Sequence, residues 1–206
     1  MFALVESGSI TRMLNGNRGI TVDGVQHPRT IFTLWTEAER NAIGIYAVEI
    51  DESKKKDEKW YINTNITYAF DGSKVTGSYG DATAKAHADT LWTEQDKTDG
   101  DIPEGKDVGD VAVEGLKTIL IRQIKSQAKN ELDITDWYIT RKAEKDTAIP
   151  SSITTHRDAV RAKQAEMETA ITNASDTPAL ETLYTYTRQE DGTSTRPLGE
   201  LPTLED

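Results

Sequence analysis

Cysteine is absent from this chain of 206 residues, and histidine occurs only three times, as His27, His87 and His156. Without cysteine the chain can form neither disulfide bonds nor thiolate metal ligands. The histidines are too far apart in sequence to form a His-x-x-x-His pair, which would place two metal ligands on one helical face. We therefore expect no metal site and no cofactor.

Positive charge is also scarce, because 24 Lys and Arg residues against 35 Asp and Glu residues give a formal net charge of -11. Nucleic acids and anionic membrane surfaces are bound largely through Lys and Arg, so this balance argues against both partners. No apolar run approaches the roughly 18 residues that a membrane-spanning helix requires. The first residues lack the basic start of a signal peptide, and we expect a soluble protein made in the cytoplasm.

The common sequence motifs of catalysis are missing as well. The chain has no Gly-x-x-x-x-Gly-Lys phosphate loop, no Gly-x-Gly-x-x-Gly nucleotide motif and no Gly-x-Ser-x-Gly nucleophile motif. Carboxylates are so abundant that no single pair indicates a glycosidase. The acidic segment from Asp96 to Glu104 does not keep the spacing of a calcium-binding loop. The sequence therefore favours a protein that is not an enzyme.

Residues 1–93 have the pattern of a small β-rich domain. Short β-branched segments flank Asp23-Gly24, a pair that predicts a two-residue hairpin turn. Ile45 to Ile50 predicts a strand, and residues 60–76 predict a second hairpin.

One short helix is expected inside this β-rich domain. Thr36 is followed three residues later by Glu39, the spacing of a capping box, and the helix should stop at Gly44. The segment before it, residues 30–35, is rich in β-branched and aromatic side chains and fits either a strand or the start of a short helix.

Two segments have the composition of polar connections. Residues 94–110 are rich in acidic residues and glycine and predict a solvated linker between domains. Residues 186–206 contain Asp191-Gly192 and few apolar side chains, which predicts an extended tail ordered only against a partner.

Residues 111–185 predict a helical hairpin. A buried stripe with spacings of three and four marks one helix from Val111 to Leu132, and a near-heptad series marks a second. The first stripe comprises Val113, Leu116, Leu120, Ile124, Ala128 and Leu132. The second series comprises Ile153, Val160, Met167, Ile171 and Ala174. We expect the two to pack together, which makes the chain an α+β protein.

The ends of these helices carry further signals. Residues 133–144 should continue as a helix after a kink, and Pro150 should break it, with a serine capping the next helix. Thr177 before Pro178 predicts the start of a short third helix.

Aromatic and basic side chains gather around this hairpin in an otherwise acidic chain. The residues concerned are Trp137, Tyr138, Arg141, Lys142, Arg157 and Arg161. One interpretation places the two aromatic rings in the hairpin core and leaves the cations solvated or paired with acids. The other makes Trp137, Tyr138, Arg141, Arg157 and Arg161 a docking surface, because Trp, Tyr and Arg contribute strongly to interfaces. The hairpin core and a docking rim can also coexist.

The segment from Val113 to Leu183 resembles a phage tail assembly chaperone-like domain. The resemblance rests on the run from Trp137 to Glu144, the break at Ile149-Pro150 and the spacing of Arg157 and Arg161.

The N-terminal part is similar, more loosely, to leading segments of tail-fibre-related phage proteins. His27-Pro28 precedes an apolar segment, Trp35-Thr36-Glu37 begins a helix, and Gly44-Ile45 follows it. These families offer no catalytic residues.

The resemblance implies a structural role in a phage tail. We expect a non-enzymatic virion protein of the tail, baseplate or fibre-attachment region that binds neighbouring virion subunits in a multi-copy assembly. It would be synthesised in the host bacterial cytoplasm and reside in the phage tail. The alternative is a transient tail or tail-fibre assembly chaperone, absent from the mature particle. A tail enzyme that cleaves glycans is the third possibility.

Overall fold

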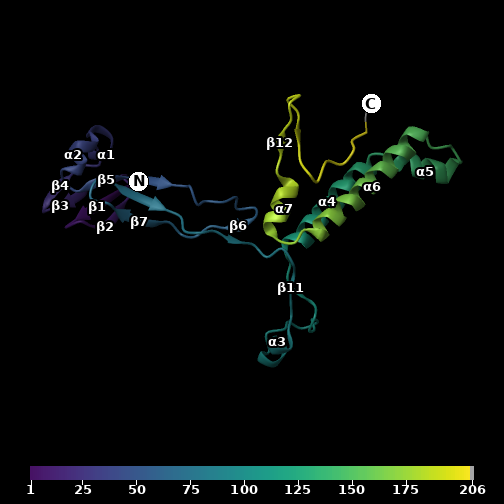
Figure 1. The fold of residues 1–206 in the computed structure, drawn as a ribbon, viewed down its shortest axis with the longest axis horizontal. Helices are drawn as coiled ribbons and strands as arrows, with labels where there is room; N and C mark the ends of the chain where they lie inside the picture. Colours follow the sequence, from purple (N-terminus) through teal and green to yellow (C-terminus); the bar gives the residue numbers. More distant parts are fainter. Residues whose placement is uncertain (205–206) are drawn as a thin grey trace. The chain divides into compact units, whose positions relative to one another are not determined.

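The computed structural model describes residues 1–204. The chain forms two compact units, and the boundary between them lies between Thr83 and Ala84. The first unit consists mainly of strands and the second mainly of helices (Figure 1). The predicted α+β class is therefore confirmed. The division lies earlier than the domain end expected at residue 93, and residues 94–110 belong wholly to the second unit.

A curled five-stranded sheet in the order β2-β1-β5-β8-β7 forms the centre of the first unit. Its strands are β1 (Phe2–Glu6), β2 (Ser9–Leu14), β5 (Ile45–Asp51), β7 (Thr67–Phe70) and β8 (Val75–Ser78). Neighbouring strands are antiparallel except β5 and β8, which run parallel with Val48 opposite Val75. The predicted strand from Ile45 is thus confirmed. The hairpin predicted over residues 60–76 is confirmed only from Thr67 onward, since β6 at residues 61–62 pairs with β9 instead.

Short elements complete the first unit. They are β3 (Ile20–Val22), β4 (Val25–His27), α1 (Ile31–Leu34), α2 (Glu37–Asn41), β6 (Tyr61–Ile62) and, at the division, β9 (Thr83–Ala84). Asp23 and Gly24 form the predicted turn between β3 and β4, both with positive φ, at 47° and 77°. The capping box is also confirmed, because the Thr36 N–H donates to Glu39 Oε2 over 2.7 Å.

The apolar core of the first unit lies on both faces of β1. Leu4 belongs to one cluster, and its neighbours Ala3 and Val5 belong to another, because successive side chains of a strand point to opposite faces. The first cluster contains Leu4, Ile20, Val22, Ile31, Phe32 and Ile45. The second contains Ala3, Val5 and Val75, with Ile10, Tyr46, Val48 and Phe70 packed around them.

The second unit is built around two long helices. Its elements are β10 (Thr90–Leu91), α3 (Glu94–Asp99), β11 (Val111–Val113), α4 (Leu116–Asp133), α5 (Asp136–Lys145), α6 (Ser151–Asn173), α7 (Thr177–Tyr184), β12 (Thr187–Arg188) and β13 (Ser194–Thr195). Across residues 1–204, every helix falls short of the length or the apolar character needed to cross a bilayer.

Helices α4 and α6 lie side by side (Figure 1). The buried side chains of α4 are Leu116, Leu120, Ile124 and Ala128, and the buried apolar side chains of α6 are Ile153, Val160, Met167 and Ile171. These are the residues of the predicted stripes, so the hairpin is confirmed. The first helix begins later than expected, since residues 111–113 pair with β10 and Val113 is 64% exposed.

The acidic segment 94–110 forms a closed loop within the second unit. Its ends are joined by the pairing of β10 with β11, and by backbone hydrogen bonds from Trp92 to Asp110 and from Gly109 to Trp92, each 2.9 Å. Inside the segment, Thr93 and Asp96 form a capping box at the start of α3. Local side-chain hydrogen bonds therefore order a stretch whose composition suggested a linker.

Two predicted helix caps are wrong. Pro150 occupies the cap position of α6, so Ser151 is already helical and no side chain caps that helix. Asp176 caps α7, with its Oδ1 accepting from the Ala179 N–H over 2.8 Å. Thr177 is buried in the first turn and donates its hydroxyl to the Lys85 carbonyl over 2.6 Å, so its role is tertiary.

The C-terminal tail packs on its own unit, unlike the tail expected from composition. Strands β12 and β13 pair around the Asp191-Gly192 turn. Leu198 is 1% exposed, and its N–H donates to the Leu183 carbonyl over 3.0 Å. The buried Leu198, together with the stacking of Arg196 on the Tyr184 ring, thus fixes a polar segment.

Candidate partner-binding surface

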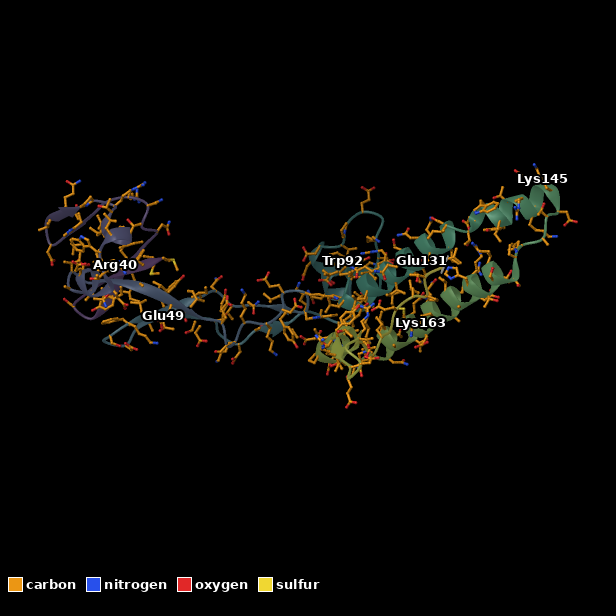
Figure 2. All side chains as sticks on the ribbon, turned by 90° about the horizontal axis from the view of Figure 1, so that it is seen from above. Arg40, Glu49, Trp92, Glu131, Lys145 and Lys163 are labelled. Atoms are coloured by element: carbon orange, nitrogen blue, oxygen red, sulfur yellow. The ribbon has the colours of Figure 1, made fainter. Side chains whose placement is uncertain are left out.

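Helix α5 forms the tip of the helical hairpin and exposes apolar side chains there. Figure 2 shows Lys145, its last residue, at the free end of the hairpin. No residue of α5 is buried, and Trp137 is 52% exposed. Ile134, in the bend before α5, is 58% exposed, and Ile139 is also exposed. The interpretation that Trp137 fills the hairpin core is therefore wrong.

Trp137, Tyr138 and Arg141 form one stacked group, here called the aromatic cluster. The two ring centroids lie 3.8 Å apart with an interplanar angle of 33°. The Arg141 guanidinium carbon lies 4.6 Å from the Trp137 centroid and 5.3 Å from that of Tyr138. Such cation–π contacts contribute about 0.5–1 kcal/mol at exposed sites, so they favour the stacked arrangement.

Arg157 lies beneath the bend that carries this cluster. Only 8% of the residue is exposed, and its Nη1 lies 2.8 Å from the Leu132 carbonyl oxygen, 2.7 Å from Thr135 Oγ1 and 2.8 Å from Asp136 Oδ1. The guanidinium charge thus lies at the C-terminal end of α4, where backbone carbonyls are unpaired. It also lies beside Asp136, an acid in the first turn of α5. Arg157 therefore fixes the direction of α5, and its guanidinium is closed to a partner.

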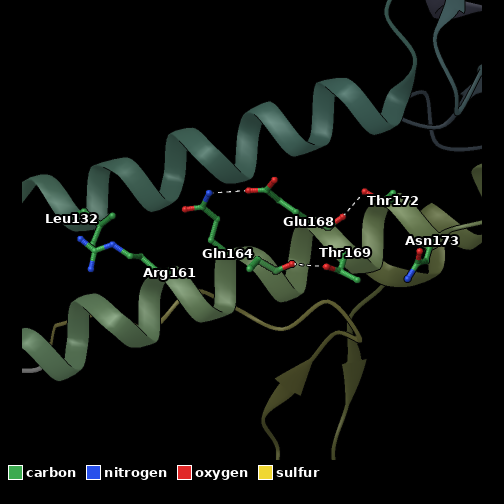
Figure 3. A pocket seen from close by; sticks show the side chains of 8 residues that line it. Leu132, Arg161, Gln164, Glu168, Thr169, Thr172 and Asn173 are labelled. Carbon is green, nitrogen blue, oxygen red and sulfur yellow. Dashed lines mark hydrogen bonds between the residues drawn. The ribbon is translucent and has the colours of Figure 1, made fainter.

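Arg161 lies one turn further along α6, at a groove between α6 and α4 with a volume of about 700 Å³. Figure 3 shows Gln164 and Glu168 inside this groove, where Gln164 Nε2 donates to Glu168 Oε1 over 2.8 Å. Lys125 of α4 lies 3.4 Å from Glu168. The Lys125–Glu168 pair thus joins the two helices at the groove, and the exposed Arg161 side chain pairs with Asp158 at 3.4 Å.

The five residues predicted to bind a partner consequently do not form one surface. Three of them, the aromatic cluster, lie together, with Trp137 exposed and Tyr138 and Arg141 half-buried, whereas Arg157 lies beneath the bend and Arg161 lies at the groove. Sequence reasoning missed Thr135, which is fully buried under the bend. The position of Arg157, four residues after Ile153 and three before Val160, is the signal that could have placed it on the buried stripe.

The electrostatics around the tip come from local pairs. The hydrogen bond and charge of Asp133 raise the pKa of Lys129 at the end of α4. Arg141 has no ion pair within residues 1–204; it is half-buried against the rings of Trp137 and Tyr138, and its Nε is buried without a hydrogen-bond partner. In the same described range, no group of three or more histidines and carboxylates is arranged to hold a metal ion.

Comparison of the chain with protein-family models, curated proteins and solved structures finds no match. The phage-tail resemblance therefore stays a prediction, and the geometry of the second unit has to support any functional proposal by itself.

Proposed function

We propose that this chain is a non-enzymatic structural protein of a phage tail, baseplate or fibre-attachment region that binds neighbouring subunits through the aromatic cluster. The observation that carries the binding role is the exposure of Trp137 beside an unpaired Arg141 at the hairpin tip. Burying an aromatic ring together with a desolvated arginine is the arrangement that dominates the energy of many protein interfaces.

The supporting structure also favours binding. Arg157 holds α5 at three acceptor atoms, and the rings and the Arg141 guanidinium are stacked before any partner arrives. A preorganised surface loses little conformational entropy when it binds, so more of the contact energy remains as affinity. The phage location rests on the sequence resemblance alone.

Mass spectrometry of purified particles tests the location. Particles of a phage that carries this gene should contain the protein, in a proportion that gives several copies per tail. Presence in infected-cell lysate with absence from particles would favour the assembly chaperone. Polysaccharide cleavage by the isolated protein, lost on changing one carboxylate, would favour a tail enzyme.

The binding surface is tested separately by Trp137→Ser in the full chain. This change should remove the protein from particles, or from the complex with its partner, while its circular dichroism stays unchanged. Ile139→Ser, an exposed apolar residue on the same helix, is the matched control and should have a smaller effect. Equal incorporation of wild type and Trp137→Ser would overturn the role of the aromatic cluster.

A further inference from the structure

A hollow in the first unit lies between the end of β2 and the loop that follows it. Its volume is about 330 Å³, and it is lined by Arg12, Met13, Leu14, Asn15, Gly16, Asn17, Arg18, Gly19, Ile20, Thr21 and Phe32. A second hollow shares Arg18 and Gly19 with the first and adds Gln26, His27, Pro28 and Arg29. The two together are here called the arginine hollow.

The charge of the arginine hollow is opposite to that of the chain. No lining residue is Asp or Glu, although acidic residues outnumber basic ones in the sequence. Most basic side chains elsewhere form ion pairs or stack on rings, but within residues 1–204 Arg12, Arg18 and Arg29 have no ion pair. Arg12 and Arg18 line the first hollow, and Arg18 and Arg29 line the second. Two free guanidinium groups at each hollow make a site for an anion, because the guanidinium fork matches an oxyanion with two hydrogen bonds.

The remaining lining residues suit the rest of such a ligand. Asn15, Asn17, Thr21 and Gln26 have side-chain donors and acceptors without a hydrogen-bond partner in the described chain, so they can bind hydroxyl groups. The buried Phe32, with Leu14 and Ile20, adds apolar surface. Pockets for small ligands combine an apolar lining with a few polar groups in this way.

The loop is also held in place before a ligand binds. A Cβ atom on Gly19 would lie 2.6 Å from the His27 carbonyl oxygen, so the loop backbone packs directly on the end of β4. The His27 ring in turn contacts Trp35 edge-on, with centroids 5.5 Å apart. We infer that the arginine hollow binds a small polyhydroxylated oxyanion of the sugar-phosphate or sugar-acid class.

Titration of the isotope-labelled full chain by NMR tests this site with three probes. Glucose 6-phosphate and glucuronate carry the two candidate oxyanions, and glucose is the neutral control. The two anions should shift the amide signals of residues 15–19 and 26–29, and glucose should not. Binding of only one anion would support the site and identify phosphate or carboxylate as the recognised group.

Arg18→Gln, at the residue shared by both hollows, should weaken binding at least about tenfold, since a charge-assisted bidentate contact is lost. Arg188→Gln, at an exposed arginine of β12, should leave the affinity unchanged. Amide signals of Arg18→Gln that match those of the wild type away from residue 18 would show that the variant is folded. The site is overturned if neither anion binds, if glucose shifts the same signals, or if Arg18→Gln binds as well as wild type.

Discussion

The two units of this protein bury their apolar side chains in different ways. In the first unit, the central strand β1 contributes to a cluster on each face, so two small cores share one strand. In the second unit, α4 and α6 bury one continuous seam of leucine, isoleucine, valine and methionine. Each stripe of the seam is set by residues four to seven positions apart on one helix, whereas the double core depends on several short elements from different parts of the chain.

The comparison shows where stability is concentrated. Each position of the α4–α6 seam contacts the same partner helix, so a charge placed anywhere along it disrupts one shared core. The first unit distributes its packing over two clusters, and its weak points are the close backbone contacts that hold strands and loops in register. Substitutions at these two kinds of site should therefore destabilise one unit and leave the other folded.

The largest effect is expected for Leu120→Asp, at a side chain only 2% exposed in the seam. Burying an unpaired carboxylate should destabilise the second unit by more than about 4 kcal/mol and unfold the hairpin. Far-ultraviolet circular dichroism should fall, while the NMR signals of residues 1–83 remain. Ile139→Asp, at an exposed helical position, is the control and should melt like wild type; an intact hairpin in Leu120→Asp would refute the packing scheme.

Gly44→Ala should be the most damaging small change in the first unit. Gly44 has φ of 76°, and an added Cβ would lie 2.5 Å from the Val5 carbonyl oxygen in β1. Conformational strain and the clash with backbone together should cost about 2–4 kcal/mol in the free energy of unfolding.

Gly24→Ala separates these two contributions. Gly24 has nearly the same φ, 77°, but no atom lies within 4 Å of an added Cβ. Its effect should be limited to strain, about 1–2 kcal/mol. Urea unfolding followed by NMR signals of the first unit measures both variants, and equal losses would show that the contact with Val5 is unimportant.

Arg157→Met should weaken the bend between α4 and α5. The apolar replacement leaves the Leu132 carbonyl and Thr135 hydroxyl without their charged donor, and we expect a loss of roughly 1.5–3 kcal/mol. Arg161→Met removes a guanidinium that lies at the surface and should change stability by less than about 1 kcal/mol. Thermal unfolding measures both. Similar melting temperatures for the two variants would contradict a supporting role for Arg157.

Arg157 also shows what could be predicted from the sequence. The α4 and α6 stripes, the Asp23-Gly24 turn and the Thr36 capping box were predictable, because each depends on residues a few positions apart. The periodicity of α6 places Arg157 on the buried stripe, but its acceptors lie more than twenty residues earlier, and a side-chain periodicity does not identify them. Nor does the sequence decide between the two interpretations of Trp137, whereas in the structure no residue of α5 is buried and Trp137 is 52% exposed.

The parallel pairing of β5 with β8 was not predictable in the same way. The β-branched and aromatic residues of β5 predict a strand, but they do not state which strand lies alongside or in which direction. Likewise, composition marked residues 94–110 as a linker, while the pairing of β10 and β11 that closes this segment on itself involves only short strands.

The smallest expected effect is on the pH dependence of stability. It can be tested at one turn in each unit. Between β7 and β8, backbone N–H groups of Lys74 and Ser73 donate to the Asp71 carboxylate and lower its pKa from 3.8 to about 2. Because the folded pKa is below the unfolded value, this stabilisation is complete above about pH 4 and is lost as the pH falls toward 2. Asp71→Asn should therefore flatten the pH dependence of first-unit stability in that interval, measured as urea midpoints.

Asp191, in the turn between β12 and β13, provides the matched case in the second unit. The hydroxyl and N–H of Thr193 donate to its carboxylate and lower its pKa. That hairpin consists of exposed residues outside the α4–α6 seam, so Asp191→Asn should alter amide exchange within residues 187–195 and leave the unfolding of the helices unchanged. An equal change in the helical unfolding midpoint would mean that the hairpin and the seam unfold together, and that the second unit is more cooperative than its packing indicates.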